Sequence, residues 1–226
     1  FADRNRNNGV YLKGSDHNII KSFDINSNGL SGIFLENSNN TIINQTTINN
    51  NNEFGIDIKN SKNIIMDRNN IFKNVLTGIR ITDSVNITIK GKYIENNLGS
   101  GIIIYHSNNV TVDSLSIYNN TFHGIRLENS VYSVINNSKI NLNKNSGISS
   151  LNSNYTLIKN NNITSNSGLG IYSSSSYYNN IEKNLGPGFE NPTQKEYEKY
   201  FINIRKILNK SIYFIPYDGY ESNKDS

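Results

Sequence analysis

Two columns of residues, each with a period of 23 positions, bring together charged and aromatic side chains that could do chemistry. The first column is Tyr11, Phe34, Asp57, Arg80, Ile103, Arg126, Ser149 and Tyr172, and the second is Lys13, Glu36, Lys59, Thr82, Tyr105, Glu128, Leu151 and Ser174. Arg and Lys side chains bind carboxylates, and the guanidinium group does so through paired hydrogen bonds. Aromatic rings offer flat faces for stacking, and Tyr, His or Lys can transfer protons. His106 follows directly after one of the tyrosines.

These columns belong to a repeat that runs through most of the 226-residue chain. A Gly followed by an aliphatic residue recurs every 23 positions without an insertion or deletion: Gly9, Gly32, Gly55, Gly78, Gly101, Gly124, Gly147 and Gly170. If each Gly is offset 0, the two columns above stand at offsets 2 and 4. Ser stands at offset 6 in eight repeats, and Asn at offset 19 and Ile at offset 16 in seven. A period of this length indicates a solenoid.

Each repeat contains three short segments rich in β-branched residues, at about offsets 1–4, 9–12 and 15–17. Apolar and polar residues alternate within them, which is typical of half-buried strands, and none is long enough for a helix. Three short strands per repeat predict an all-β, single-stranded parallel β-helix of about eight 23-residue coils. Offsets 1, 3, 9, 11 and 16 are then expected to point inward, and offsets 2 and 4 outward.

The composition is dominated by 45 Asn and 34 Ile, with no Cys, no Trp and one Met. An Asn excess of this size could indicate disorder, but the regular spacing of Ile and Val argues against it. The periodic Ser and Asn columns fall in the turns, where side chains can bond backbone groups that lack strand partners. An Asn ladder between coils is therefore expected, and the Gly column is expected to supply an unusual backbone angle.

The pattern Gly-Ile-x-Leu-x-Asn-Ser-x-Asn-x-Ile-Ile at 32–43 resembles the right-handed parallel β-helix repeat of carbohydrate-binding and sugar-hydrolase domains. That pectin-lyase-like superfamily includes pectate-lyase-like enzymes, alginate epimerases, a periplasmic copper-handling maturation protein and surface adhesins. The resemblance covers Gly9 to about Asn184. It implies a right-handed solenoid whose first strands bind sugar on their outward face. It is specific for fold and weak for function, because one solenoid carries unrelated activities.

The two ends of the chain depart from the repeat. We predict a β-helix over 1–184 and a C-terminal cap over 185–226. The cap would hold an amphipathic helix at about 194–209, a short strand at about 212–215 and a frayed tail, since 193–196 is a capping box and apolar residues follow at helical spacing. The helix would cover the end of the solenoid or dock a partner. Residues 1–8 would be the tail of a preceding coil, so further coils or a cap are expected before Phe1.

Two hypotheses account for the charged columns in coils two to six. The first is a track for an acidic polysaccharide, in line with the family resemblance. Its substrate-binding residues would be Phe34, Glu36, Asp57, Lys59, Arg80, Tyr105, Arg126 and Glu128. Its catalytic residues would be Tyr105, His106, Lys59 and Arg80, with Tyr, His or Lys as the base and Arg neutralising a uronate carboxylate. The second hypothesis, which the pattern favours, is a set of ion pairs between coils.

Several kinds of site and partner receive little support. The chain has no Cys, and its three His are far apart, so no metal site is predicted. Calcium would be needed only by a lyase, with Glu36, Asp57 and Asp83 as the nearest acids. Lys and Arg do not cluster, which argues against nucleic acid. Apolar runs of four to five residues are too short for a transmembrane segment. Equal repeat lengths leave no loops to build a cleft, which argues against an enzyme.

The sequence therefore predicts an extracellular or cell-surface protein, or a periplasmic one, that acts as a rigid scaffold or adhesin-like domain contacting polysaccharide. One alternative is a polysaccharide lyase or epimerase acting on acidic glycans. Another is a phage or virus fibre segment that oligomerises through an outward apolar stripe at offset 10. That stripe consists of Ile19, Ile42, Ile65, Val134 and Leu157. It is expected to be either an oligomer interface or the surface on which the predicted C-terminal helix packs.

Overall fold

The computed structural model describes residues 2–186. The helix expected at about 194–209 and the strand expected at about 212–215 lie outside the described residues, as does nearly all of the predicted 185–226 cap. Residues 2–186 are all-β and contain no helix. The described part of the chain therefore has no helix of the length and hydropathy needed to cross a membrane.

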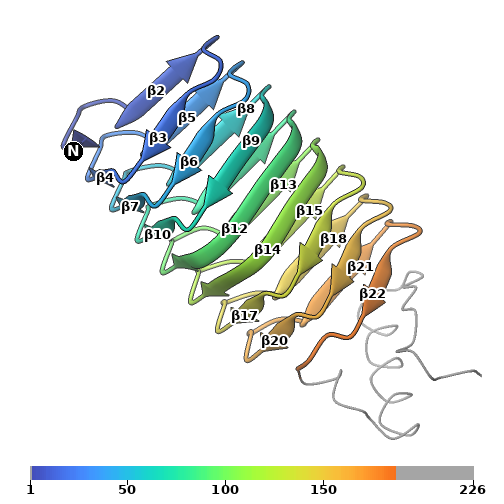
Figure 1. Cartoon of the computed structure of the whole chain (residues 1–226). Helices are drawn as coiled ribbons and strands as arrows, with labels where there is room; N and C mark the ends of the chain where they lie inside the picture. Colours follow the sequence, from blue (N-terminus) through green and yellow to red (C-terminus); the bar gives the residue numbers. More distant parts are fainter. Residues whose placement is uncertain (1, 187–226) are drawn as a thin grey trace, which may run out of the picture.

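The chain winds into stacked coils in which strands 23 residues apart pair in parallel (Figure 1). The first strands of successive coils form an eight-stranded sheet in sequence order, here called the first sheet. Its strands are β2 (Val10–Lys13), β5 (Ile33–Glu36), β8 (Ile56–Lys59), β11 (Ile79–Thr82), β13 (Ile102–Tyr105), β15 (Ile125–Glu128), β18 (Ile148–Leu151) and β21 (Ile171–Ser174). The register never shifts, so residues at one offset are direct neighbours across this sheet.

The second and third strands of the coils form one fourteen-stranded sheet, here called the second sheet. Its strands are β1 (Ala2–Asp3), β3 (Ile19–Lys21), β4 (Asp24–Asn26), β6 (Ile42–Asn44), β7 (Thr47–Asn49), β9 (Lys62–Asp67), β10 (Asn70–Phe72), β12 (Val85–Glu95), β14 (Asn108–Tyr118), β16 (Val134–Asn136), β17 (Lys139–Asn141), β19 (Leu157–Lys159), β20 (Asn162–Thr164) and β22 (Asn180–Glu182). The predicted three strands are present in coils one to three, six and seven, and the described residues of coil eight contain two strands, β21 and β22. In coils four and five two of the three strands merge into one, β12 and β14 respectively. They merge because Lys92 pairs with Leu115 across the corner, so the ladder continues where other coils bend.

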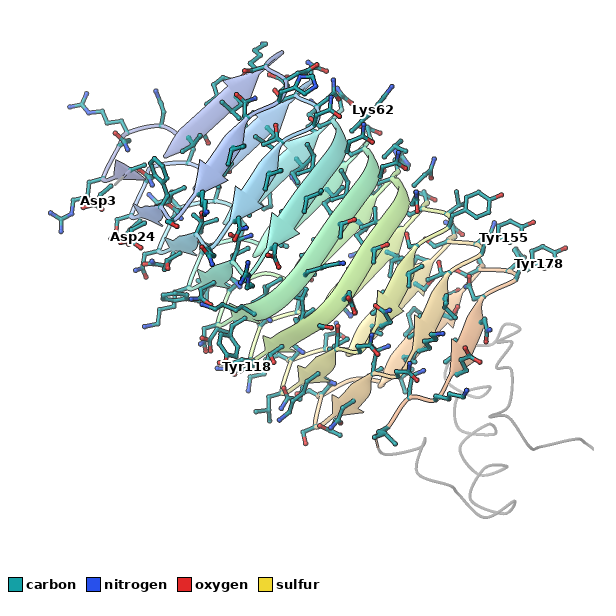
Figure 2. All side chains as sticks on the ribbon, viewed as in Figure 1. Asp3, Asp24, Lys62, Tyr118, Tyr155 and Tyr178 are labelled. Carbon is teal, nitrogen blue, oxygen red and sulfur yellow. The ribbon has the colours of Figure 1, made fainter. Side chains whose placement is uncertain are left out.

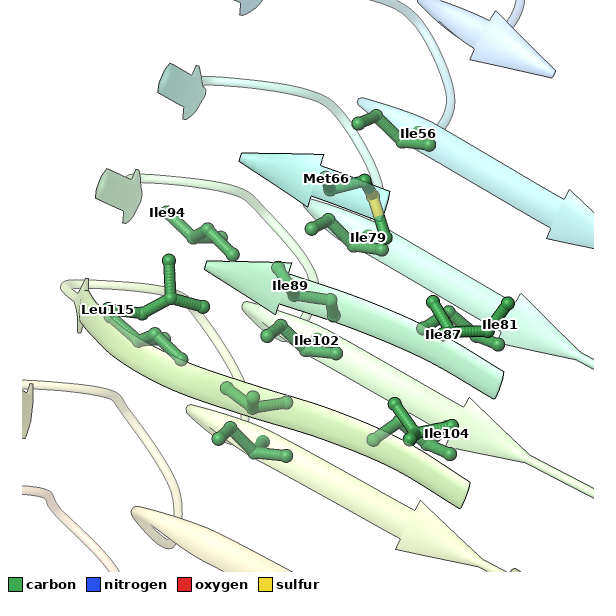
Figure 3. Packing of buried hydrophobic residues seen from close by; sticks show 14 of the residues in the cluster. Ile56, Met66, Ile79, Ile81, Ile87, Ile89, Ile94, Ile102, Ile104 and Leu115 are labelled. Carbon is green, nitrogen blue, oxygen red and sulfur yellow. The ribbon is translucent and has the colours of Figure 1, made fainter. Parts of the chain in front are cut away.

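The core is a set of aliphatic columns that run the length of the rod. Offsets 1, 3, 11 and 16 are occupied mainly by Ile, and most of these side chains are fully buried. Figure 3 shows this stacking around Ile79, Ile89 and Ile102, with Met66 filling one place in a column. Each fully buried side chain of this kind stabilises the fold by roughly 1.5–3 kcal/mol. The predicted inward offsets are confirmed, and repeated burial holds the register of both sheets.

The Asn column at offset 19 forms the expected ladder inside the solenoid. At each step a backbone N–H and a side-chain Nδ2 both donate to the Oδ1 atom of the Asn one coil further on. For Asn74 and Asn97 these distances are 3.0 and 3.0 Å. Asn5 makes the same contacts to Asn28, so the ladder extends to Asn5. The Ser column at offset 6 works similarly, since each Oγ accepts from the Ser N–H of the previous coil.

The expected role of the Gly column is wrong. The column glycines from Gly9 to Gly147 do not have positive φ; instead, each lies against the Ile at offset 16 of its own coil and against the carbonyl oxygen of the Gly in the next coil. A Cβ atom on Gly78 would be 2.6 Å from Ile94 Cγ2 and 2.7 Å from the carbonyl oxygen of Gly101. The column is Gly because the chain leaves no space there.

Left-handed backbone occurs instead at four corners of coils one to seven, at offsets 5, 8, 13 and 18, and at the first three of these corners in coil eight, within the described residues. Thirteen of the non-Gly residues with positive φ are Asn. Asn tolerates this conformation better than other side chains because its short amide can bond locally. The Asn excess therefore has two structural causes, the buried ladder and the left-handed corners.

Candidate functional site

The outward face of the first sheet brings together the charged and aromatic side chains at offsets 2 and 4. Strand alternation places these residues outside while offsets 1 and 3 face the core. Parallel pairing sets Asp57 beside Arg80, and Tyr105 beside Glu128. We call this surface the charged face.

At its centre, Arg80 is held by a buried carboxylate. Arg80 Nε donates to Asp57 Oδ1 at 2.8 Å and Nη2 donates to Oδ2 at 2.7 Å. The guanidinium carbon also lies 3.8 Å from the centroid of the Phe54 ring, a cation–π contact. Asp57 is only 4% exposed, and both of its oxygens are used by Arg80. Asp57 is therefore a partner of Arg80 rather than a free ligand for a cation.

At the N-terminal end, Glu36 is surrounded by donors from the coil below. Tyr11 donates through its hydroxyl to Glu36 Oε2 at 2.6 Å, and Lys13 Nζ lies 3.3 Å from the same atom. The hydrogen bond from Tyr11, followed by that from Lys13, lowers the pKa of Glu36, while the same contacts raise the pKa of both donors. The Tyr11 ring stacks on Phe34 with centroids 5.1 Å apart. The aromatic pair and the ion pair form one exposed cluster.

Tyr105 and His106 form a second aromatic cluster where β13 ends. Their ring centroids are 3.9 Å apart, and His106 has the left-handed φ of a corner residue. His106 Nδ1 lies 3.7 Å from Asp83 Oδ1, and its Nε2 lies 3.1 Å from Asn129 Nδ2. Asp83, His106 and Asn129 share offset 5, so they stand in one row across three coils. Within residues 2–186 the hydroxyl of Tyr105, a half-buried residue, has no hydrogen-bond partner.

The third cluster contains Arg126, Glu128 and His123. Arg126 Nη2 donates to Glu128 Oε2 at 2.7 Å within β15, so this ion pair lies along a strand rather than between coils. Among the described residues, His123 Nδ1 and Arg126 Nε are buried without hydrogen-bond partners. Burial, and then the charge of Arg126, lowers the pKa of His123, so its imidazole is neutral at neutral pH. A neutral imidazole beside a cation could accept a proton.

No group of three or more His, Cys, Asp or Glu side chains within residues 2–186 is placed to hold a metal ion.

Residues 2–114 and 77–185 match the sequence profile of the family described as the right-handed beta helix region. The chain belongs to this family. No curated protein sequence is significantly similar to it.

Solved structures with the same fold include two epimerases, one named for alginate and one for mannuronan, and one phage tailspike domain. The periplasmic alginate epimerase AlgG is 20% identical with a TM-score of 0.71, over 79% of this chain and 47% of that chain. The A-module of the Azotobacter vinelandii mannuronan C-5 epimerase AlgE6 is 18% identical with a TM-score of 0.64, over 74% of this chain and 51% of that chain. The enzymatically active domain of bacteriophage CBA120 tailspike protein 2 is 14% identical with a TM-score of 0.67, over 80% of this chain and 33% of that chain. The chain thus spans about half the length of the epimerases, and the likeness establishes the fold.

The charged face supports parts of both sequence hypotheses. The pairing of Asp57 with Arg80, and of Lys13 with Glu36, is present as the ion-pair hypothesis required. Two contributors were missed in the sequence, Phe54 and His123, both at the position directly before the column Gly. That position looks like turn, but its side chain lies beside the charged face, as the contact between Phe54 and Arg80 demonstrates. The aromatic character of these two residues was the available signal.

Proposed function

We propose that this domain is an extracellular, cell-surface or periplasmic scaffold that binds an acidic polysaccharide along the charged face. The observation that carries the proposal is the row of cationic and aromatic side chains on a sheet whose coils have identical lengths. A flat face without loops accommodates an extended polymer. The likeness to epimerases named for alginate and mannuronan, one of them periplasmic, supports both the ligand class and the location.

Binding would use the cations that remain accessible around the internal ion pairs. The side chains of Arg80 and Arg126 are 39% and 37% exposed. Lys59 is also exposed, in register with Glu36. Tyr105 adds a ring and a hydroxyl between the two arginines. Glycan carboxylates would approach the free edges of the guanidinium groups, and this attraction would weaken as salt rises.

The test is titration calorimetry with pectate, alginate and hyaluronan against the wild type and Arg126→Ala. A matched control is Lys159→Ala, which removes a half-exposed cation 4.0 Å from Glu182 on the second sheet. We expect Arg126→Ala to weaken binding roughly tenfold, as loss of a charge-assisted contact does, and the control to leave it unchanged. Equal loss in both variants, or no binding of any of the three polymers, would refute the proposal.

A second candidate is a lyase or epimerase acting on acidic glycans, favoured by the neutral imidazole of His123 beside Arg126. Arg126 would neutralise the uronate carboxylate while His123 or Tyr105 accepts the neighbouring C5 proton. Unsaturated uronate absorbance detects the lyase, and proton NMR of the polymer detects C5 inversion. Each is measured with and without calcium. Activity that is lost in His123→Gln and Tyr105→Phe supports the candidate, and an inactive wild type excludes it for these polymers.

A fibre segment is a further alternative, supported by the outward stripe at offset 10. Ile19 and Ile65 are 69% and 46% exposed on the second sheet. Thr88 and Thr111 interrupt the stripe in coils four and five. A trimer in light scattering that dissociates in Ile65→Asp would support this alternative, and a monomeric wild type would exclude it.

A further inference from the structure

The corner that follows the first strand changes its chemistry along the rod. At offset 8, coils one to five carry His17, Asn40, Asn63, Asn86 and Asn109, and coils six to eight carry Tyr132, Tyr155 and Tyr178. The Asn side chains form an exposed amide ladder, with Nδ2 to Oδ1 distances of 3.0, 3.1 and 2.8 Å. The backbone is left-handed throughout, and the three Tyr have φ values of 56°, 53° and 56°. Bulky side chains rarely adopt this conformation.

The three tyrosines form a continuous exposed stack, which we call the tyrosine ladder. Their ring centroids are 5.1 Å apart at both steps, with interplanar angles of 18° and 9°. Tyr132, Tyr155 and Tyr178 are 59%, 48% and 78% exposed. Figure 2 shows Tyr155 and Tyr178 projecting side by side from the edge of the solenoid. The rings cover one another's inner faces and present their edges, their hydroxyls and the end faces of the stack to solvent.

Folding alone does not explain this substitution. Asn suits the left-handed corner and continues the hydrogen-bonded column, whereas Tyr strains the backbone and leaves large apolar rings in water. Backbone strain is concentrated at functional sites, so a column that changes from Asn to Tyr at a left-handed corner is a candidate for function. Because the stack holds the rings in place before a ligand arrives, little side-chain entropy would be lost on binding.

The surroundings of the ladder indicate the kind of ligand. Segments 129–133, 152–156 and 175–179 contain only Asn, Ser, Thr, Val and Tyr, with no charged residue. Corners in earlier coils carry Asp16, Lys62 and Asp83. A second exposed ring, Tyr177, stands beside Tyr178. Surfaces built from Tyr, Ser and Asn combine rigid aromatic contact area with adaptable hydrogen bonding.

We propose that the tyrosine ladder is a second glycan site, which binds a neutral oligosaccharide. Sugar C–H faces pack on the ring edges and end faces, and sugar hydroxyls bond to the phenols and to neighbouring Asn and Ser groups. A charged glycan would find no counter-ion at this corner. The site is separate from the charged face, so it extends the proposed function and does not depend on it.

The test is a binding screen with cellohexaose, mannohexaose and maltohexaose, read by calorimetry. The variant replaces Tyr132, Tyr155 and Tyr178 by Asn, the residue that the same corner holds in coils two to five, so the fold is expected to be retained. A matched control is Tyr93→Asn, which removes a 47% exposed tyrosine away from the ladder. We expect at least one hexaose to bind, and the triple variant to bind it about tenfold or more weakly.

Salt and acidic polymers separate this site from the charged face. Hexaose binding should be unchanged between about 50 and about 500 mM NaCl, because no ion pair is formed. The triple variant should bind acidic polymers like the wild type, and Arg126→Ala should bind the hexaose like the wild type. The proposal is overturned if no hexaose binds, or if the triple variant binds as well as the Tyr93 control. It is also overturned if the ladder instead mediates self-association, seen as a dimer that the triple variant loses.

Discussion

Removing one rung from the middle of the Asn ladder should destabilise the whole solenoid. Asn97 is fully buried, and its Oδ1 atom accepts from Asn74 N at 3.0 Å and from Asn74 Nδ2 at 3.0 Å. In Asn97→Ala both donors lose this acceptor. Asn74 Nδ2 keeps only a weak contact of 3.5 Å to the carbonyl oxygen of Ile48. The backbone N–H of Asn74 would have no partner and no access to water.

The magnitude follows from the number of stranded groups. A buried polar group without a partner costs about 1–3 kcal/mol, so two of them cost about 2–6 kcal/mol. The matched control is Asn166→Ala at the C-terminal end of the same ladder, where Asn166 is half-buried. Water can replace the lost acceptor there, so we expect a cost of about 1 kcal/mol. Both variants lose one side-chain amide, so the difference between their losses of unfolding free energy measures the effect of burying the ladder.

Urea unfolding followed by far-UV circular dichroism measures both variants, and tyrosine fluorescence provides a second probe because the chain has no Trp. Since a solenoid is stabilised through neighbouring coils, a break in coil four should also lower cooperativity. Equal losses in Asn97→Ala and Asn166→Ala would show that burial of the ladder does not set its contribution. A loss below about 0.5 kcal/mol in Asn97→Ala would refute the hydrogen-bond argument itself.

Three further predictions test the packing, the ion pair and the titration of single residues. Gly78→Ala should lower the free energy of unfolding by about 1–3 kcal/mol because its Cβ would overpack. Gly14→Asn, at a left-handed corner with open space, should leave it nearly unchanged. Chemical unfolding in which Gly14→Asn is the more destabilising variant would contradict the packing argument. Asp57→Ala should lower the free energy of unfolding by about 1–3 kcal/mol. The same variant should bind acidic glycan more tightly, because Arg80 loses its carboxylate partner. Calorimetry that shows weaker binding by a folded variant would contradict this prediction. Because the pKa of His123 is lowered below its usual 6.5, its contribution to stability should be full above that pH and fall as pH drops through it. NMR titration should place the pKa of His123 below 6.5, and His123→Gln should remove this pH dependence.

The sequence predicts the solenoid well because burial in it is strictly periodic. Most inward columns have an apolar residue at the same position in successive coils. The 23-residue spacing of Ile25, Ile48 and Ile71 therefore predicts that each lies in a strand, that its side chain faces the core, and which residues pair across the sheet. The backbone conformation at the corners is harder to predict from the sequence, because the spacing of residues does not indicate their φ angles. For this reason the Gly column was expected to supply a backbone angle, whereas close contacts with its own coil and with the next coil are what require a residue without a side chain. The merging of two strands into β12 in coil four and into β14 in coil five was not predicted, because it depends on the pairing of Lys92 with Leu115 across the corner.

Contacts in the candidate site could be predicted from the sequence only where both residues stand in the same 23-residue column. Asp57 and Arg80 are 23 residues apart, so their contact follows from register alone. The pairing of Arg126 with Glu128 within one strand does not follow from the column pattern, because both side chains had other neighbours one coil away. Phe54 and His123 precede the column Gly and looked like turn residues. Their contribution depends on the direction in which the chain bends before each first strand.

A solenoid without insertions has one means of building a site, which is to change the residues within a column. At offset 2 this change produces a buried carboxylate that fixes a guanidinium, and at offset 8 it replaces a stabilising amide ladder with a stack of tyrosines. Each change keeps the coil length and therefore the register of every other column. The two surfaces are consequently held at fixed positions on one rigid rod. A charged polymer and a neutral sugar could then be bound at once, because neither surface must move to accommodate the other.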